Sequence, residues 1–188
     1  MKRGISLSVI IIILAASFFE PRNLVSSYCT AIVLDVEDGK EVCGFVVASL
    51  DKDTQSISVR NMTYTGSFKD AIKAMKDSDI RLFLPTVRGI FVNPDVDEQW
   101  LESSVAEIIA EKGMPLNASV VYCDTPSQII EEKDGGTDAV GATFIPKLLK
   151  NQKQSRSLLD FFEDKDKQAA FIEYEDGRFI IKKDEADE

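Results

Sequence analysis

The sequence contains no histidine among its 188 residues. Imidazole is the general base of Ser-His-Asp and Cys-His catalytic sites and a ligand in most zinc sites. The composition therefore excludes these catalytic classes and disfavours zinc. Cysteine is also scarce, with only Cys29, Cys43 and Cys123. Because their number is odd, at least one thiol stays outside any intramolecular disulfide.

The spacing of the first two cysteines argues against a disulfide between them. Asp38-Gly39 is a typical two-residue hairpin turn, and it places Cys43 opposite Leu34 on the preceding strand. Cys29 then lies about 17 Å further along that strand, at ~3.4 Å per residue. A disulfide needs Cα atoms within ~7 Å of each other. We therefore expect buried thiols that pack as small hydrophobic groups.

Basic residues are outnumbered, with 22 Lys and Arg against 32 Asp and Glu, and the formal net charge is -10. An acidic surface repels phosphate backbones, so we expect no nucleic-acid partner. Hydrophobic residues make up 44% of the chain, which is enough for one domain with a core of its own. Part of the acidic excess lies at residues 183–188, which we predict to be a solvated tail.

The N-terminal segment is apolar after a short basic start. Lys2 and Arg3 precede a mostly apolar run from Ile5 to Phe19, which is the pattern of a secretory signal. The run is shorter than the ~20 apolar residues that a membrane-spanning helix prefers. Two alternatives therefore stay open for residues 1–19: a cleaved signal peptide or a retained membrane anchor. In both, the basic end stays inside, so the rest of the chain is expected on the extracytoplasmic side.

The hydrophobic pattern of residues 20–182 predicts a single α+β domain with a mixed β-sheet packed by helices. The expected order is βββ-α-β-α-β-α-α-α-ββ. Strands are expected at 28–36, 42–50, 55–64, 81–93 (bent or interrupted at Pro85), 117–122, 169–174 and 178–182, and helices beginning at Ser67, Asp95, Thr125, Thr143 and Ser157.

Pairs of carboxylates are the main candidates for catalysis or metal binding. Acid–base catalysis needs two carboxylates in different environments within a cleft, and a calcium loop needs about six oxygen ligands. Each pair lies in an expected turn or at a helix end, so we predict no catalytic residue, no metal ligand and no cofactor. One alternative function that such a pair would allow, a carboxylate-based hydrolase of cell-wall sugars, stays open. The pairs are Asp51/Asp53, Asp95/Asp97 and Glu131/Glu132.

Three large aromatic residues are the candidates for a protein interface. Trp100 and the adjacent Phe161 and Phe162 are of the kind that dominates binding surfaces. Each also lies at helical spacing from other apolar residues, which is equally typical of core packing. The sequence leaves both alternatives open.

Several short sequence motifs follow one another in an order known from one family. Residues 20–24 (EPRNL) lead into the strand 31–35, and 64–72 (YTGSFKDAI) lead into a helix. The arginine-led strand 81–92 and the helix at 145–153, which begins Ile-Pro, complete the order. In this order the chain resembles the N-terminal domain of the C subunits of Ger-type spore germinant receptors, which are membrane-tethered proteins of endospore-forming bacteria.

This resemblance covers most of residues 20–182 and implies a non-enzymatic accessory subunit. Such subunits act with polytopic membrane partners in nutrient-triggered germination, on the extracytoplasmic side of the spore inner membrane. Two departures concern the ends of the region. The family typically carries a lipid-anchored cysteine after the export segment, where residues 17–21 here are SFFEP, and it continues with further domains beyond the part matched here. The alternative is a free-standing exported module that binds a small molecule, secreted if the signal is cleaved.

Overall fold

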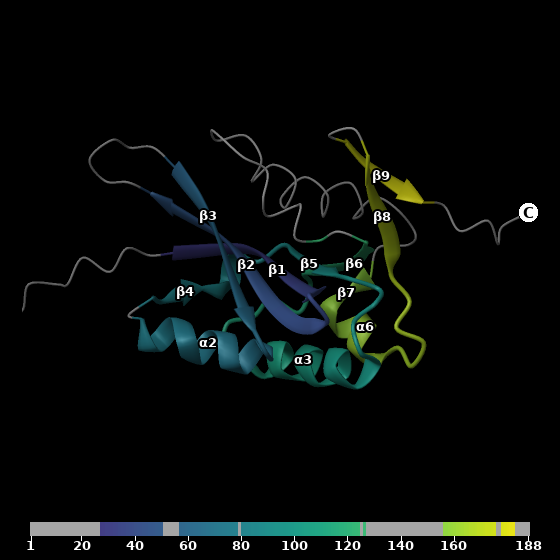
Figure 1. The fold of residues 1–188 in the computed structure, drawn as a ribbon, viewed down its shortest axis with the longest axis horizontal. Coiled ribbons are helices and arrows are strands. Elements are labelled where there is room, and N and C mark those ends of the chain that lie inside the picture. The colour runs from purple at the N-terminus through teal and green to yellow at the C-terminus, as the bar shows by residue number, and fades with distance from the viewer. Residues whose placement is uncertain are drawn as a thin grey trace, which may run out of the picture.

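The computed structural model describes residues 27–50, 57–78, 80–124, 126, 156–175 and 178–182. These residues form a single α+β domain with one mixed sheet and helices packed on it, as the sequence predicts (Figure 1). Several predicted segments lie outside the described residues. They are the leader with Ile5 and Phe19, the helix from Thr125 apart from Pro126, the helix from Thr143, and the acidic tail.

The sheet has nine strands, seven of which follow the order β3-β2-β1-β5-β6-β8-β9. The first three are antiparallel, β1, β5, β6 and β8 run parallel to one another, and β9 returns antiparallel. Short strands β4 and β7 pair with β1 and β6. The bounds are β1 Ser27–Glu37, β2 Lys40–Leu50, β3 Ile57–Thr65, β4 Leu82–Phe83, β5 Gly89–Val92, β6 Ser119–Cys123, β7 Arg156–Ser157, β8 Ala170–Glu175 and β9 Arg178–Lys182.

The first hairpin has the predicted register. Asp38 and Gly39 both have positive φ angles, 52° and 72°, as the tight turn between right-twisted strands requires. Cys43 consequently lies opposite Leu34, and Cys29 lies opposite Val47. All three cysteines are buried and none forms a disulfide with another, as expected.

The strand predicted at 81–93 is interrupted at Pro85, also as expected. A 3-10 helix, η1 (Leu84–Thr86), separates β4 from β5 and begins with Pro85 in its first turn, where the missing N–H costs nothing. The hydroxyl of Thr86 donates a 2.8 Å hydrogen bond to the carbonyl oxygen of Cys29. This bond fixes the interruption against β1.

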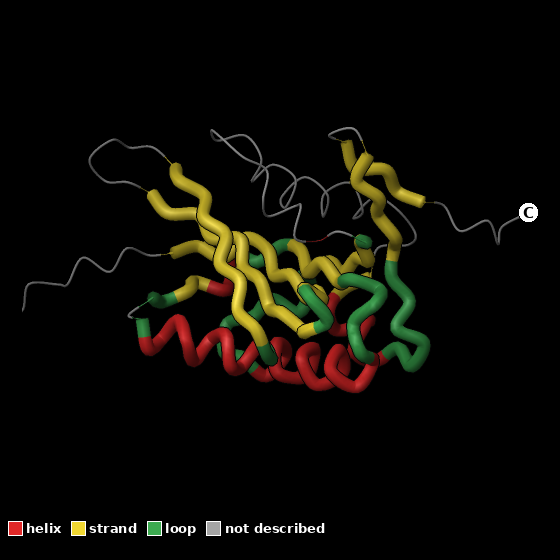
Figure 2. Tube along the Cα trace, viewed as in Figure 1, coloured by secondary structure: helices red, strands yellow, loops and turns green. Residues whose placement is uncertain are grey.

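Three helices contribute to one face of the sheet: α2 (Phe68–Asp77), α3 (Glu98–Ala110) and α6 (Leu158–Glu163). Figure 2 shows α2 and α3 lying along the same side of the strands. Helix α2 begins with the predicted capping box between Ser67 and Asp70. Helix α3 starts later than predicted, because Asp97 rather than Asp95 is its N-cap and accepts a 2.9 Å hydrogen bond from the Trp100 N–H.

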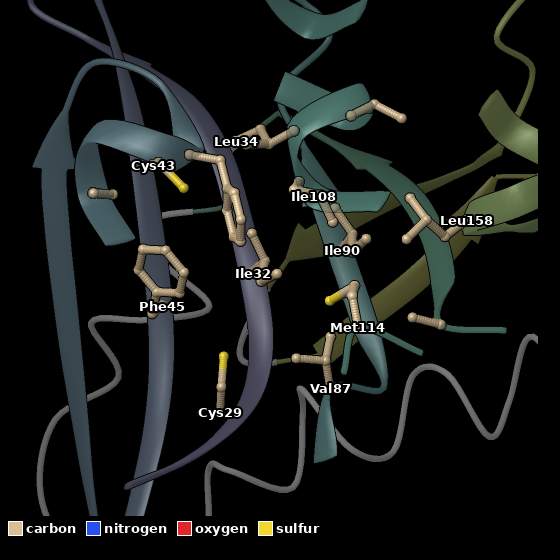
Figure 3. Packing of buried hydrophobic residues seen from close by; sticks show 14 of the residues in the cluster. Cys29, Ile32, Leu34, Cys43, Phe45, Val87, Ile90, Ile108, Met114 and Leu158 are labelled. Atoms are coloured by element: carbon tan, nitrogen blue, oxygen red, sulfur yellow. The ribbon is translucent and has the colours of Figure 1, made fainter. Parts of the chain in front are cut away.

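The side chains of the sheet divide into two clusters on opposite faces. In β1, Ile32 and Leu34 join the main core with the helices, whereas Ala31 and Val33 belong to a second buried cluster. Figure 3 shows the main core, in which Phe45 lies between Cys43 and Cys29 on the same face. Phe45 thus separates the two thiols along the sheet, which is why they cannot pair.

Candidate interaction surfaces and cavity

Helix α6 has apolar side chains both in the core and at the surface. Leu158 and Phe161 are each 0% exposed and pack in the main core, while Leu159 and Phe162 are 38% and 43% exposed. The predicted aromatic pair is therefore divided by the helix. Phe161 packs in the core, as the second of the two alternatives for these aromatic residues had it. Phe162 is at the surface, and its role in an interface stays a prediction.

A capping box fixes the start of α6. The Ser157 hydroxyl accepts a 3.1 Å hydrogen bond from the Asp160 N–H, and the Asp160 carboxylate accepts one of 3.3 Å from the Ser157 N–H. The Ser157 hydroxyl and the Ser157 N–H both donate to the Asp160 carboxylate. Both bonds lower the pKa of this carboxyl, and the bond from the hydroxyl has the larger effect. This box orients the helix so that Leu159 and Phe162 point outward.

Leu116 extends the exposed apolar area next to α6. Its carbonyl oxygen accepts a 3.2 Å hydrogen bond from the Leu159 N–H, and its side chain is 41% exposed. Lys167 borders the area, with its Nζ 5.8 Å from the ring centre of Phe162 and 2.9 Å from the Phe162 carbonyl oxygen. We call Leu116, Leu159 and Phe162 the α6 surface. The pattern LLDFF could have indicated it, because its four apolar side chains cover a wider arc of the helix than the stripe that a surface helix usually buries.

Trp100, the third predicted interface residue, lies in the first turn of α3. Its side chain is half-buried against the main core. This position fits core packing, and the structure does not add Trp100 to the α6 surface.

A second exposed apolar pair lies where the described chain begins. Tyr28 of β1 and Phe83 of β4 are 40% and 46% exposed, with ring centres 5.6 Å apart in an edge-to-face arrangement. The parallel register of the two strands places them side by side. The sequence analysis did not find this pair, because no local pattern shows that Leu82 and Phe83 pair with β1.

A cavity of about 450 Å³ opens between α2, the segment 80–84 and the residue that follows α3. Five apolar and three charged side chains line it. Lys76 and Glu111 form a loose ion pair of 4.0 Å across it. Arg81 is exposed and has no ion pair or hydrogen bond within the described part of the chain. The lining residues are Ile72, Met75, Lys76, Ile80, Arg81, Leu82, Leu84 and Glu111.

Polar side chains also gather at the carboxyl ends of β1 and β5, the position where open α/β sheets commonly bind ligands. Here the groups satisfy one another. The Asn93 amide donates to Asp35 Oδ1 at 2.6 Å and to the Asp124 carbonyl oxygen at 3.4 Å, and its own oxygen accepts from the Asp95 N–H at 2.8 Å. This arrangement ties strand ends together.

Of the predicted carboxylate pairs, only Asp95/Asp97 lies within the described residues, and both of its members have structural roles. Asp97 caps α3, and the backbone of Asp95 is held by Asn93. The pairs 51/53 and 131/132 lie outside the described residues. Within the described ranges, no group of three or more Cys, Asp or Glu side chains is arranged to hold a metal ion.

The described helices are all too short or too polar to cross a bilayer. No family model matches the chain, and neither the curated proteins nor the solved structures give a significant match.

Proposed function

We propose that this protein is a non-enzymatic, extracytoplasmic accessory subunit of a membrane complex, of the kind formed by the C subunits of spore germinant receptors. The observation that carries this proposal is helix α6. Exposed apolar side chains that lie together on a folded domain commonly mark an interaction site. The outer face of α6, with Leu159 and Phe162, is exposed in the isolated chain, so a partner protein is the expected cover.

The partner is a polytopic membrane subunit, and the chain would meet it close to the bilayer. The predicted leader ends near Phe19, and β1 begins at Ser27. Residues 20–26, even fully extended, span no more than about 25 Å. A leader retained as an anchor would therefore hold the domain within reach of short extracytoplasmic segments of its partner, at the spore inner membrane if the family resemblance holds.

The α6 surface is small, so a few side chains would carry most of the binding energy. Aromatic and large apolar residues at the centre of an interface typically cost 2 kcal/mol or more on truncation, and neighbouring residues cost much less. Phe162 occupies this position in the α6 surface, beside Lys167.

The test is co-purification of the full chain from membranes of sporulating cells of its source. A polytopic membrane protein should accompany the wild-type chain. The double variant Leu159→Ser/Phe162→Ser should retain less than a tenth of it. The matched control is Phe83→Ser, which removes an equally exposed ring from a different surface and should keep the partner. A wild-type chain that is found intact in the cytosol, or that leaves the membrane as a monomer without a membrane protein, would refute the proposal.

The second candidate is a free-standing exported module that binds a small molecule, and the cavity beside α2 favours it. A ligand that binds only the folded state raises the melting temperature of the protein. Under this alternative, a panel of small nutrients and peptidoglycan fragments should contain compounds that raise the melting temperature, while Leu159→Ser/Phe162→Ser has no effect on function.

A further inference from the structure

We propose that the cavity beside α2 is a binding site for a small monocarboxylate with an apolar chain. The proposal uses residues remote in sequence from the α6 surface and does not depend on what that surface binds. It holds for an accessory subunit and for a free-standing module alike.

The floor of the cavity is apolar and well packed. Met75, Leu84 and Ile72 are only 1%, 5% and 7% exposed, and they continue directly into the main core. Ile80 and Leu82 form half-buried walls. The cavity volume of about 450 Å³ falls in the range of small-molecule sites. An alkyl chain that enters here is stabilised because its CH₂ groups are removed from water.

Among the described residues at the mouth of the cavity, one cation has no ion pair or hydrogen bond. Glu111 faces Lys76 at 4.0 Å, so these two charges offset each other in part. Arg81 remains free within the described residues. A guanidinium presents its N–H groups as a planar fork that matches a carboxylate, so Arg81 can bind one in bidentate fashion.

The end of α2 would repel an anion if its carbonyl oxygens were free, because the C-terminus of a helix is partly negative. Three of these oxygens, those of Ala74, Met75 and Lys76, accept hydrogen bonds. The Ser78 N–H donates to the carbonyls of Ala74, Met75 and Lys76, and the Ile80 N–H donates to that of Met75 at 2.9 Å. The local capping therefore reduces the negative potential, and Arg81 determines the sign of charge that the mouth prefers.

The experiment compares two probes of equal chain length and opposite charge, hexanoate and hexylammonium, on the full chain in lipid nanodiscs. Binding is followed by ¹³C-methyl spectra of its methionines and isoleucines. Hexanoate should shift the signals of Met75, Ile72 and Ile80 with saturation. The signal of Met62, which lies on β3 away from the cavity, should stay unchanged. Hexylammonium should bind at least tenfold more weakly.

Two variants and a control complete the test. Arg81→Gln should weaken hexanoate binding at least tenfold, and Ile80→Phe, which fills the cavity, should abolish the saturable shifts. Arg60→Gln removes an exposed arginine from β3 and should change the affinity less than twofold. Equal binding of both probes, an unchanged affinity in Arg81→Gln, or no saturable shift in the wild-type protein would overturn the proposal. Because Leu159→Ser/Phe162→Ser should leave hexanoate binding intact, failure here is distinguishable from failure of the docking proposal.

Discussion

The side-chain amide of Asn93 donates a 2.6 Å hydrogen bond to Oδ1 of the buried Asp35, and so joins the end of β5 to β1. The two side chains are 8% and 4% exposed. The same Asp35 oxygen accepts a 2.8 Å bond from the Val36 N–H. A buried polar group is costly unless it is hydrogen-bonded, so the bond from Asn93 helps to offset the cost of burying Asp35.

Replacing Asn93 should therefore destabilise the domain by more than an ordinary polar substitution. Asn93→Ala removes a donor from buried Asp35 and an acceptor from the Asp95 N–H. We expect the free energy of unfolding in urea to fall by about 2–3 kcal/mol. Asn61→Ala, at an exposed position of β3, is the control and should change it by less than about 0.5 kcal/mol. Equal effects of the two variants would show that the Asn93–Asp35 bond contributes little.

Ser104 of α3 predicts a change of the opposite sign. Its side chain is 0% exposed, and its Oγ has no hydrogen-bond partner among the residues that the structure describes. Ser104→Ala removes this unsatisfied hydroxyl and improves helix propensity, so stability should rise by about 1 kcal/mol. Ser103→Ala, next to it on the exposed side, isolates the propensity effect and should give a smaller gain. A loss of stability in Ser104→Ala would mean that the hydroxyl is satisfied.

The parts of the fold that the sequence predicted correctly are mostly those that depend on local patterns. Asp38-Gly39 specifies its own turn, and Pro85 interrupts its strand, because each acts through the backbone of the residues beside it. The late start of α3 was missed because Asp95 and Asp97 are equally good caps by sequence. The bond from Asn93 to the backbone of Asp95 decides between them, and it depends on the β1–β5 pairing.

The candidate sites were much less accessible to sequence analysis. The cavity combines α2, the segment 80–84 and Glu111, and no local pattern shows that these meet. The Tyr28–Phe83 pair likewise arises from the pairing of β1 with β4. Such contacts depend on the order of strands in the sheet, which one sequence does not encode locally. The sequence offered Phe161 and Phe162 together as interface candidates; only Phe162 lies at the surface, and its role in an interface stays a prediction.

Cys29 predicts a specific loss of stability at alkaline pH. Burial raises the pKa of its thiol from the ordinary 9.0 to about 12. Between these values the unfolded chain binds fewer protons than the folded one, so the free energy of unfolding falls as pH rises. This group contributes a slope of up to ~1.4 kcal/mol per pH unit. Burial also raises the pKa of Cys43 well above its ordinary value, and this adds to the same trend.

The Cys29→Ala variant isolates this contribution. Urea unfolding between pH 8 and pH 10.5 should show a shallower decline for Cys29→Ala than for the wild-type protein. At pH 7 the Cys29 thiol is protonated in the folded and in the unfolded wild-type chain, so the difference in stability between the two proteins gives the effect of packing alone. If the two stability curves remain parallel up to pH 10.5, the Cys29 thiol does not titrate with a raised pKa.

The division of α6 into an inner and an outer face predicts opposite behaviour for two adjacent phenylalanines. Phe161 is fully buried beside Tyr122, with ring centres 6.0 Å apart, so Phe161→Ala should lower the free energy of unfolding by about 3–5 kcal/mol. Phe162→Ser should change it by less than about 0.5 kcal/mol, because the side chain is 43% exposed and lies outside the core. Thermal and urea unfolding of the purified chain measure both. A large loss in Phe162→Ser would place that ring in the fold itself and remove the α6 surface as a docking site, since a ring needed for folding is not free for a partner.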